Sequence, residues 1–391
     1  MKPETIVRST LDEWADEARV PAGLADRALR RGTRRRSFKF ALFGGTGALL
    51  AGATAAVLVA GGVTGGGPDR REVAFEPVSL SSDTSLRTDL GSAFPQRLVA
   101  AGHTAVAAYY TTNAGMNRDA GTVRRTWHLY NPSTGEYERT RWTYLSVAPG
   151  MQRAAVLQGP LPASKVGVLD MKTRKVTHWI PVDRPVGGAA WSPDGRRLLL
   201  TSYASNPDVM GQPPETAPRT GYYIADGTAG AGPFHPLPPA PGNPNYRQDL
   251  GWSRDGTLIW APTAQVPSKV FYAPGGERRP APAHEAGDQE AAGLSPNGKL
   301  LPEFGPRPGP SVTVTNVETG RKAAVLPVQQ ALAWADNDRL FAIGCDVKKC
   351  TRKNEFRNRL LLIDLKGKVT PLTGYQRSDR AGSWIPVFTH R

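Results

Sequence analysis

The chain has 391 residues, 42 glycines, 35 prolines and a formal net charge of +15. This length allows two average domains or one large β domain with an appended segment. The glycine and proline content exceeds average usage but stays below that of a disordered low-complexity protein. A basic chain can bind nucleic acid, an anionic membrane surface or an acidic polymer, so the position of the charges must decide.

Residues 1–39 form a basic segment, with ten Lys and Arg against six Asp and Glu. Apolar residues from Val7 to Ala18 recur on one face of a helix, and Pro21 ends that pattern. We expect short amphipathic helices here. They could dock a partner protein in a groove, or rest against lipid headgroups through their arginines.

Residues 40–63 contain no charged side chain and are long enough to cross a bilayer as one helix. Because the arginines precede this stretch, the positive-inside rule places the N-terminus in the cytoplasm and the rest outside. The alternative is a cleaved export signal, since Arg35 and Arg36 resemble a twin-arginine motif and 53–55 reads A-T-A. Both readings place the large domain outside the cytoplasm, so nucleic acid is not an expected partner.

This arrangement resembles transmembrane anti-sigma factors, which join a cytoplasmic helical module to an outer domain through one span. The resemblance implies an alternative function, a regulator whose cytoplasmic helices bind a transcription factor. Residues 1–39 contain neither His nor Cys and so lack the zinc-binding pattern of many such modules. Residues 64–93 are polar and weakly periodic, which predicts a flexible linker before a domain at 94–391.

Within 94–391 a tight turn recurs, most clearly as Ser-Pro-Asp-Gly at 192–195. Related turns lie at 148–150, 253–256, 295–298 and 336–338, with a degenerate copy near Gly102. An apolar strand and a second turn follow each copy: WHLYN, VGVLD, GYYIADG, VFYAPGG, VTVTNVETG and LLLIDLKG. Two independent markers therefore count six units, each long enough for about four short strands.

The sequence WSPDGRRLLLTS followed by YYIADG resembles the TolB-like and WD-repeat propellers, in which this turn joins the first two strands of a blade. The resemblance covers roughly residues 95–391. It implies an all-β propeller of four-stranded blades, six of them, or seven if 72–78 or 384–388 completes another sheet. The turns at 148–150 and 336–338 depart from the pattern. Propellers host many activities, so the resemblance concerns fold rather than function.

Four connections are longer than the rest: 111–125, 204–221, 234–249 and 345–357. Propeller connectivity places them on one side, opposite the short turns. Long loops carry function more often than strands do, so this side is the predicted binding side. The alternative is that these Pro- and Gly-rich insertions are neutral.

The loop at 345–357 contains both cysteines of the chain, Cys345 and Cys350. Outside the cytoplasm, this pair predicts a disulfide. The basic residues of the loop form a candidate binding site for an acidic polymer, a lipid headgroup or a protein: Lys348, Lys349, Arg352, Lys353 and Arg357. The alternative is a solvated charged loop.

No catalytic motif is present: the chain has no G-x-S-x-G sequence, and its six histidines lack metal-ligand spacing. We therefore expect no catalytic residue, cofactor or metal, and no enzyme. The predicted function is a membrane-anchored extracytoplasmic propeller that binds a protein or ligand at the cell envelope. A propeller enzyme with an axial site is a second alternative beside the anti-sigma-like regulator.

Overall fold

The computed structural model describes residues 74–113, 121–210, 217–239, 247–263, 267–287, 291–305, 311–345, 357–377 and 381–391. The chain divides into two compact units, Met1–Leu42 and Phe43–Arg391, and every described residue belongs to the second. These residues form strands, turns and one short 3-10 helix, η1 (Pro149–Met151). Nowhere among them is there a helix long and apolar enough to span a membrane. The segments 1–39 and 40–63 lie outside the described residues.

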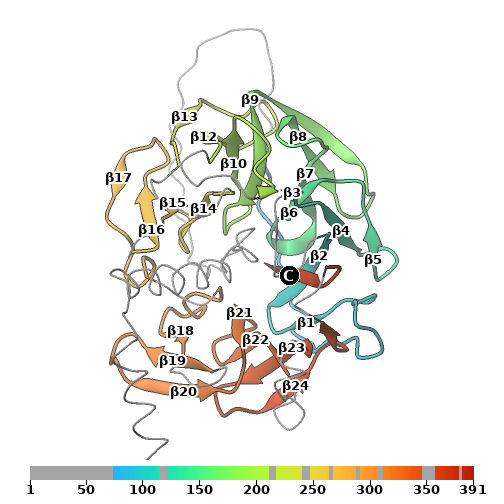
Figure 1. Cartoon of the computed structure of the whole chain (residues 1–391), viewed down its shortest axis with the longest axis vertical. Helices are drawn as coiled ribbons and strands as arrows, with labels where there is room; N and C mark the ends of the chain where they lie inside the picture. The colour runs from blue at the N-terminus through green and yellow to red at the C-terminus, as the bar shows by residue number, and fades with distance from the viewer. Residues whose placement is uncertain are drawn as a thin grey trace, which may run out of the picture. The chain divides into compact units, whose positions relative to one another are not determined.

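The first and last long strands share one sheet, and the sheets are arranged in a ring (Figure 1). β2 (Thr104–Thr112) pairs with β26 (Trp384–His390) on one side and with β4 on the other. The other strands of this five-stranded sheet are β1 (Ala100–Ala101), β4 (Arg125–Asn131) and β5 (Glu136–Arg139). The pairing of β2 with β26 closes the ring, because it joins strands from opposite ends of the domain.

The largest sheet has seven antiparallel strands and is continuous across β9 (Val176–Trp191). The first part of β9 pairs with β8 and the last part with β10, and Val186 lies opposite residues of both. The other strands are β6 (Tyr144–Val147), β7 (Arg153–Leu157), β8 (Ala163–Asp170), β10 (Leu198–Tyr203), β12 (Arg219–Ala225) and β13 (His235–Pro236).

The remaining strands form four smaller sheets. The four-stranded sheet contains β14 (Gly251–Trp252), β15 (Ile259–Pro262), β16 (Lys269–Tyr272) and β17 (Arg278–Arg279). The three-stranded sheet contains β18 (Leu300–Phe304), β19 (Val312–Asn316) and β20 (Lys322–Leu326). The second five-stranded sheet contains β21 (Gln330–Trp334), β22 (Arg339–Gly344), β23 (Arg357–Asp364), β24 (Val369–Pro371) and β25 (Gln376–Arg377). A two-stranded sheet pairs β3 (Gly121–Thr122) with β11 (Val209–Met210).

The sheet count corrects the predicted fold class. Four sheets hold four or more strands, so the propeller has four blades, not six or seven. β9 runs through 16 residues and joins two predicted units in one sheet, while the fifth unit forms only three strands. Among the described residues no seventh blade forms, because β26 joins the sheet of β2 and Ala74 makes only an isolated bridge. The helices and the transmembrane helix of the predicted class also find no counterpart in the described residues.

The recurring turns have a shared hydrogen-bond pattern. In the turn at 192–195, the Ser192 hydroxyl donates to Asp194 (2.5 Å) and accepts the amide of Arg197 (2.9 Å). Gly195 adopts a φ of +66°, which disfavours any residue with a Cβ. Ser253 and Ser295 accept the amides of Leu258 and Leu300 in the same way. These residues are structural, as expected from their turn chemistry.

Neighbouring turns also contact one another. Arg197 Nη2 donates to the carbonyl of Gly256 (2.5 Å), and the amide of Asn297 donates to Asn337 Oδ1 (2.9 Å). The turns at 148–151, 192–195, 253–256, 295–298 and 336–338 therefore gather on one side of the ring, which we name the turn face. The ends of the long connections lie at the opposite ends of the same strands, on the loop face.

Tryptophans link successive repeat units. Each ends a strand that precedes a recurring turn and donates its indole N–H to a backbone carbonyl of the preceding unit. The bonds are Trp191 to Ser146 (3.1 Å), Trp252 to Ala190 (3.0 Å) and Trp334 to Gly293 (2.9 Å). These side chains therefore pack between successive units.

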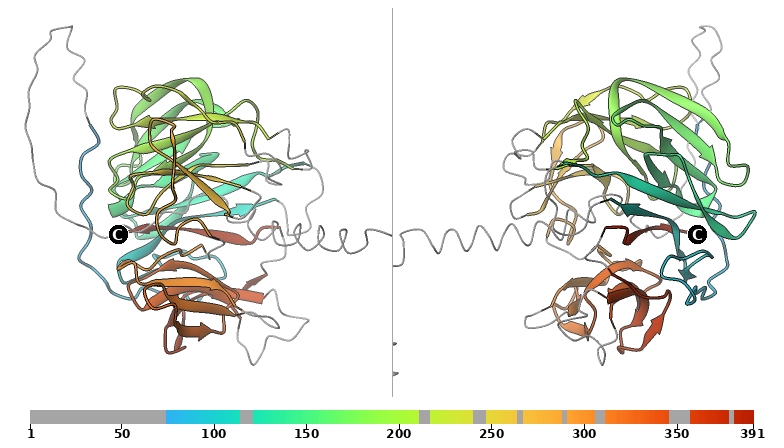
Figure 2. Two further views of the ribbon diagram at one scale, coloured as in Figure 1. Left: turned by 90° about the vertical axis from the view of Figure 1, so that its left-hand side faces the viewer. Right: turned by 45° about the vertical axis from the view of Figure 1, so that its right-hand side comes forward.

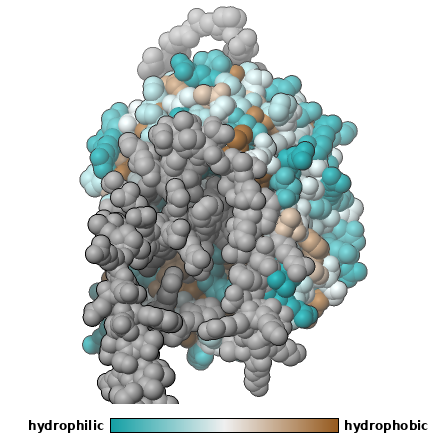
Figure 3. Space-filling view, in the orientation of Figure 1, coloured by the Kyte–Doolittle hydropathy of each residue, from teal (hydrophilic) through white to brown (hydrophobic). Residues whose placement is uncertain are grey.

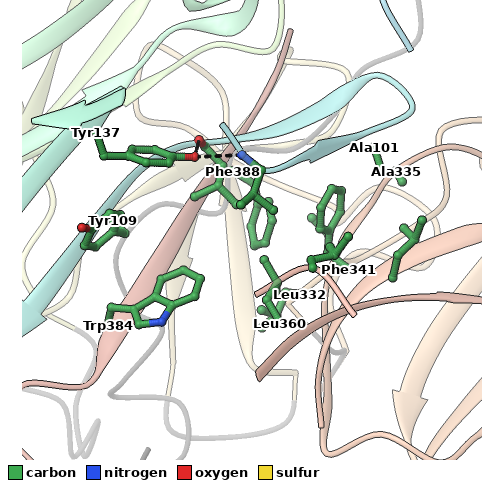
Figure 4. Packing of buried hydrophobic residues seen from close by; sticks show 14 residues of the cluster. Ala101, Tyr109, Tyr137, Leu332, Ala335, Phe341, Leu360, Trp384 and Phe388 are labelled. Atoms are coloured by element: carbon green, nitrogen blue, oxygen red, sulfur yellow. Dashed lines mark hydrogen bonds between the residues drawn. The ribbon is translucent and has the colours of Figure 1, made fainter. Parts of the chain in front are cut away.

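A buried cluster joins the sheet that contains β2 and β26 to the sheet that contains β21 to β25 (Figure 4). Phe341 of β22 and Phe388 of β26 lie with ring centroids 4.9 Å apart, and Trp384 packs edge-on against Tyr109 at 5.6 Å. The hydroxyl of Tyr137 donates to the carbonyl of Val106 (2.5 Å), so this buried polar atom is satisfied.

We name residues 74–98 the strap. Its first part lies along the turn face (Figure 2, blue), and further on Asp89 pairs with Thr373 beside the sheet of β23 and β24. Phe75 is 4% exposed and packs edge-on against Trp191 at 5.1 Å. The guanidinium of Arg153 donates to the carbonyl of Glu76 (2.6 Å). The side chain of Val78 leaves no room for a Cβ on Gly195, which would stand 2.3 Å away. Residues 74–93 fall within the segment predicted as a linker, and in the structure they contact the propeller.

The strap also contacts the closing strand. The guanidinium of Arg391 donates to the carbonyls of Ser85 (2.6 Å) and Gly102 (2.9 Å) and lies 3.5 Å from a carboxylate oxygen of Asp83. The strap thus connects residues before the first strand to the residue that follows β26.

Candidate functional site

Three of the four long connections meet on the loop face. The loop after β2 and the loop after β10 pair with each other as β3 and β11, and the amide of Val123 donates to the carbonyl of Asp208 (2.8 Å). The connection after β13 joins them through Arg247. Only the ends of these loops belong to the described residues.

A buried network of two arginines and two aspartates holds the three loops together. Arg125 lies 2.5 Å from Asp208, which in turn accepts from Nε of Arg247 at 2.7 Å. Arg247 also pairs with Asp249 at 2.7 Å. The side chains are between 5% and 13% exposed, so the network is largely removed from water. We name these four residues the loop-face network.

Neutral groups complete the network. Arg247 donates to the carbonyl of Gly187 (3.0 Å), and the hydroxyl of Tyr203 donates to Asp249 (2.8 Å). The same hydroxyl accepts the amide of Gln248 at 3.1 Å. Most donors and acceptors are therefore used within the protein, as buried polar groups require.

A third buried arginine fixes the connection between β13 and β14. Arg219, which is 3% exposed, donates to three carbonyls: those of Leu237 (3.1 Å), Pro238 (2.6 Å) and Gln248 (3.2 Å). These carbonyls come from both described ends of the loop, so one side chain holds the two ends together.

The charges of the network stabilise each other. Burial alone would raise the pKa of Asp208, but Arg247 and Arg125 outweigh burial and hold that pKa well below its usual range. Burial alone would lower the pKa of Arg247, and Asp208 with Asp249 raises it instead. Burial and the charge of Asp249 raise the pKa of Tyr203 well above its usual value. Two arginines thus face two aspartates, so the formal charges of the network cancel.

This arrangement suits positioning rather than catalysis. A buried ion-pair network contributes little net stability compared with apolar packing, but breaking it is costly, so it favours one loop arrangement. Its carboxylates already accept from arginines and a tyrosine. In the described part of the chain, no three His, Cys, Asp or Glu residues gather as a metal site would require.

Of the five residues of the predicted cationic site, only one belongs to the described residues. Lys348, Lys349, Arg352 and Lys353 lie outside the described residues, and Arg357 is the exposed first residue of β23. Arg357 lies over the ring of Tyr375, with its Cζ 5.0 Å from the ring centroid, and Arg359 lies over the same ring at 4.3 Å. Cys345 is not a free thiol. Cys350 lies outside the described residues, so the disulfide stays a prediction.

The network residues were not singled out from the sequence. The available signal was charge within loops rich in Gly and Pro, as in Arg-Gln-Asp at 247–249. That signal is weak, because solvated loops also carry charges. Pairing could not be foreseen, since Asp208 and Arg247 are 39 positions apart.

The coloured surface visible on one face of the protein is mostly polar (Figure 3). On the face seen in Figure 3, the coloured atoms are mostly hydrophilic, and the hydrophobic ones form small scattered spots. The visible coloured surface therefore offers no broad apolar patch of the kind that marks a permanent interface.

No protein-family model matches the chain, and no curated protein matches it in sequence. Solved structures of similar fold include TolB from Acinetobacter baumannii, with 13% identity and a TM-score of 0.40 over 73% of this chain and 67% of that one. The β-propeller domain of the Trilobed protease from Pyrococcus furiosus matches at 14% identity and 0.38, over 71% and 85%. Oligogalacturonate lyase from Vibrio parahaemolyticus matches at 13% and 0.41, over 75% and 90%. At these scores the likenesses carry no argument. The ring of antiparallel sheets itself makes the described part of the chain an all-β propeller.

Proposed function

We propose that this propeller is a protein-binding module whose binding side is the loop face. The observation that carries the proposal is the loop-face network, which holds together the described ends of three long connections. Loop ends that are already fixed lose less conformational entropy when a partner binds. The turn face, by contrast, is occupied by the strap.

The test places a photo-reactive amino acid at either end of β10, in the cell that makes the protein. Ala204 is exposed on the loop face, and Arg196 is exposed beside the turn at 192–195. Reaction from position 204 should capture a defined protein that position 196 does not capture. Equal capture from both positions, or capture from 196 alone, would overturn the proposal.

We further propose that the propeller is displayed at the cell envelope, with its N-terminus in the cytoplasm. The support is the uncharged stretch 40–63 and the arginines that precede it. In intact cells, Cys345 and Cys350 should react with a membrane-impermeant thiol reagent after an impermeant reductant has been added. Reaction only after lysis would contradict this location.

A further inference from the structure

β23 and β25 bring arginines and a tyrosine together on the loop face. In the register of these strands, Arg357 lies opposite Arg377. Arg357 and Arg359, two positions apart on β23, both lie over the ring of Tyr375. We name Arg357, Arg359 and Tyr375 the arginine–tyrosine site.

The two arginines of this site differ from those of the loop-face network. Arg125 and Arg247 are neutralised by buried aspartates. Within the described part of the chain, neither Arg357 nor Arg359 forms an ion pair. Nε of Arg359 is buried and has no hydrogen-bond partner there. The site therefore holds positive charge and at least one unused donor.

The tyrosine ring prepares both guanidiniums for binding. Stacking on an aromatic face restrains a guanidinium plane and leaves its N–H edge available. A planar edge of this kind matches the two oxygens of a carboxylate. Arg357 is exposed, so an Asp or Glu side chain of a partner can reach its N–H edge. Arg359 lies two positions along the same strand, over the same ring.

We propose that the arginine–tyrosine site binds a carboxylate side chain within an acidic segment of a protein partner. The inference rests on the proposed function, because it names the chemistry of a partner on the loop face. The arginine–tyrosine site contributes to binding separately from the loop-face network, because the charges of that network already balance each other.

The experiment measures binding of a fluorescent oligo-glutamate peptide to the full chain in a nanodisc. The R357Q/R359Q variant should weaken binding by about tenfold or more, since each charge-assisted hydrogen bond is strong. The matched control is K366Q/K368Q, which removes the same charge from the opposite end of the same sheet, where both lysines are exposed. The control should bind within about twofold of the parent protein. Equal weakening by both variants, or no weakening by R357Q/R359Q, overturns the proposal.

A second variant separates geometry from charge. Arg359→Lys keeps the positive charge but removes the planar group, so it should lose most of the affinity attributed to Arg359. Full affinity in this variant would show that charge alone matters and would overturn the site. Vesicles with anionic lipid provide a further arm. If R357Q/R359Q weakens vesicle binding and leaves peptide binding unchanged, the ligand is a membrane and the proposal fails.

The outcome is distinguishable from a failure of the proposed function. If the probe at position 204 captures a partner while R357Q/R359Q binds the peptide as the parent does, only the arginine–tyrosine site is wrong. If position 204 captures nothing that position 196 does not, the loop face itself is not the binding side.

Discussion

Asp249 Oδ1 occupies the space that a side chain on Gly188 would need. An ideal Cβ on Gly188 would stand 2.2 Å from that oxygen, far inside van der Waals contact. The carboxylate cannot move aside freely, because Arg247 and Tyr203 both hold it.

Gly188→Ala should therefore displace Asp249 and loosen the loop-face network. We expect the free energy of unfolding, measured in urea, to fall by about 1–3 kcal/mol, the usual cost of overpacking. Gly230→Ala is the control, because a Cβ there meets nothing within 4 Å. If both variants have the same free energy of unfolding, the contact between Gly188 and Asp249 is not tight.

Asp208→Asn should destabilise the protein more strongly. The change leaves the buried Arg125 and Arg247 facing a neutral amide, and breaking such a pair costs about 3–5 kcal/mol. Glu318→Gln is the control: its partner Lys299 is 54% exposed, and exposed pairs contribute about 1 kcal/mol or less. A loss no larger than that of the control would contradict the burial of the network.

The same aspartate predicts a pH dependence. Its pKa is lower in the folded state than in the unfolded state, where it is about 4. Its contribution to stability is therefore fully present above pH 5 and is lost as the pH falls through the folded-state pKa. Between pH 6 and pH 3 the parent should lose more stability than Asp208→Asn does. Parallel pH profiles would show that Asp208 is not responsible.

His390 predicts an acid effect in the closing strand. Burial and the stacked ring of His103, 5.5 Å away, lower the pKa of His390 to about 4. Because the folded state disfavours the proton, stability is greatest above pH 6.5 and falls as the pH drops toward 4. His390→Gln should remove part of this loss between pH 7 and pH 4.5. An NMR signal of His390 that titrates near pH 6.5 would contradict the prediction.

Phe75→Ala tests whether the strap belongs to the folded domain. Phe75 is 4% exposed, and truncating a buried Phe costs about 3 kcal/mol or more. Leu80→Ala is the control, since Leu80 is 44% exposed and should change stability by about 0.5 kcal/mol or less. Thermal or urea unfolding measures both. If both variants lower the free energy of unfolding by the same small amount, the strap does not contribute to the stability of the folded domain.

Local chemistry made part of the fold predictable. The turn at 192–195 was recognisable because Ser, Asp and Gly each fill a specific backbone role, and the structure repeats it at 253–256 and 295–298.

The blade number was not predictable in the same way. Pro181 and Pro185 interrupt the β9 segment, and proline usually ends a strand interior. In the structure, β9 continues through both prolines. Shifts of register allow its first part to pair with β8 and its last part to pair with β10. Tertiary pairing overrode the local signal. The loop-face network escaped prediction for a related reason: its residues come from three loops, and only folding brings them together.

The continuity of β9 has a consequence for local opening. Backbone amides of the units on either side of β9 belong to one hydrogen-bonded ladder. Sheets that share a strand tend to open as one cooperative unit. In native-state hydrogen exchange, the amides of β8 and β10 should therefore share one opening free energy. The amides of β19, in its separate three-stranded sheet, should have a different opening free energy.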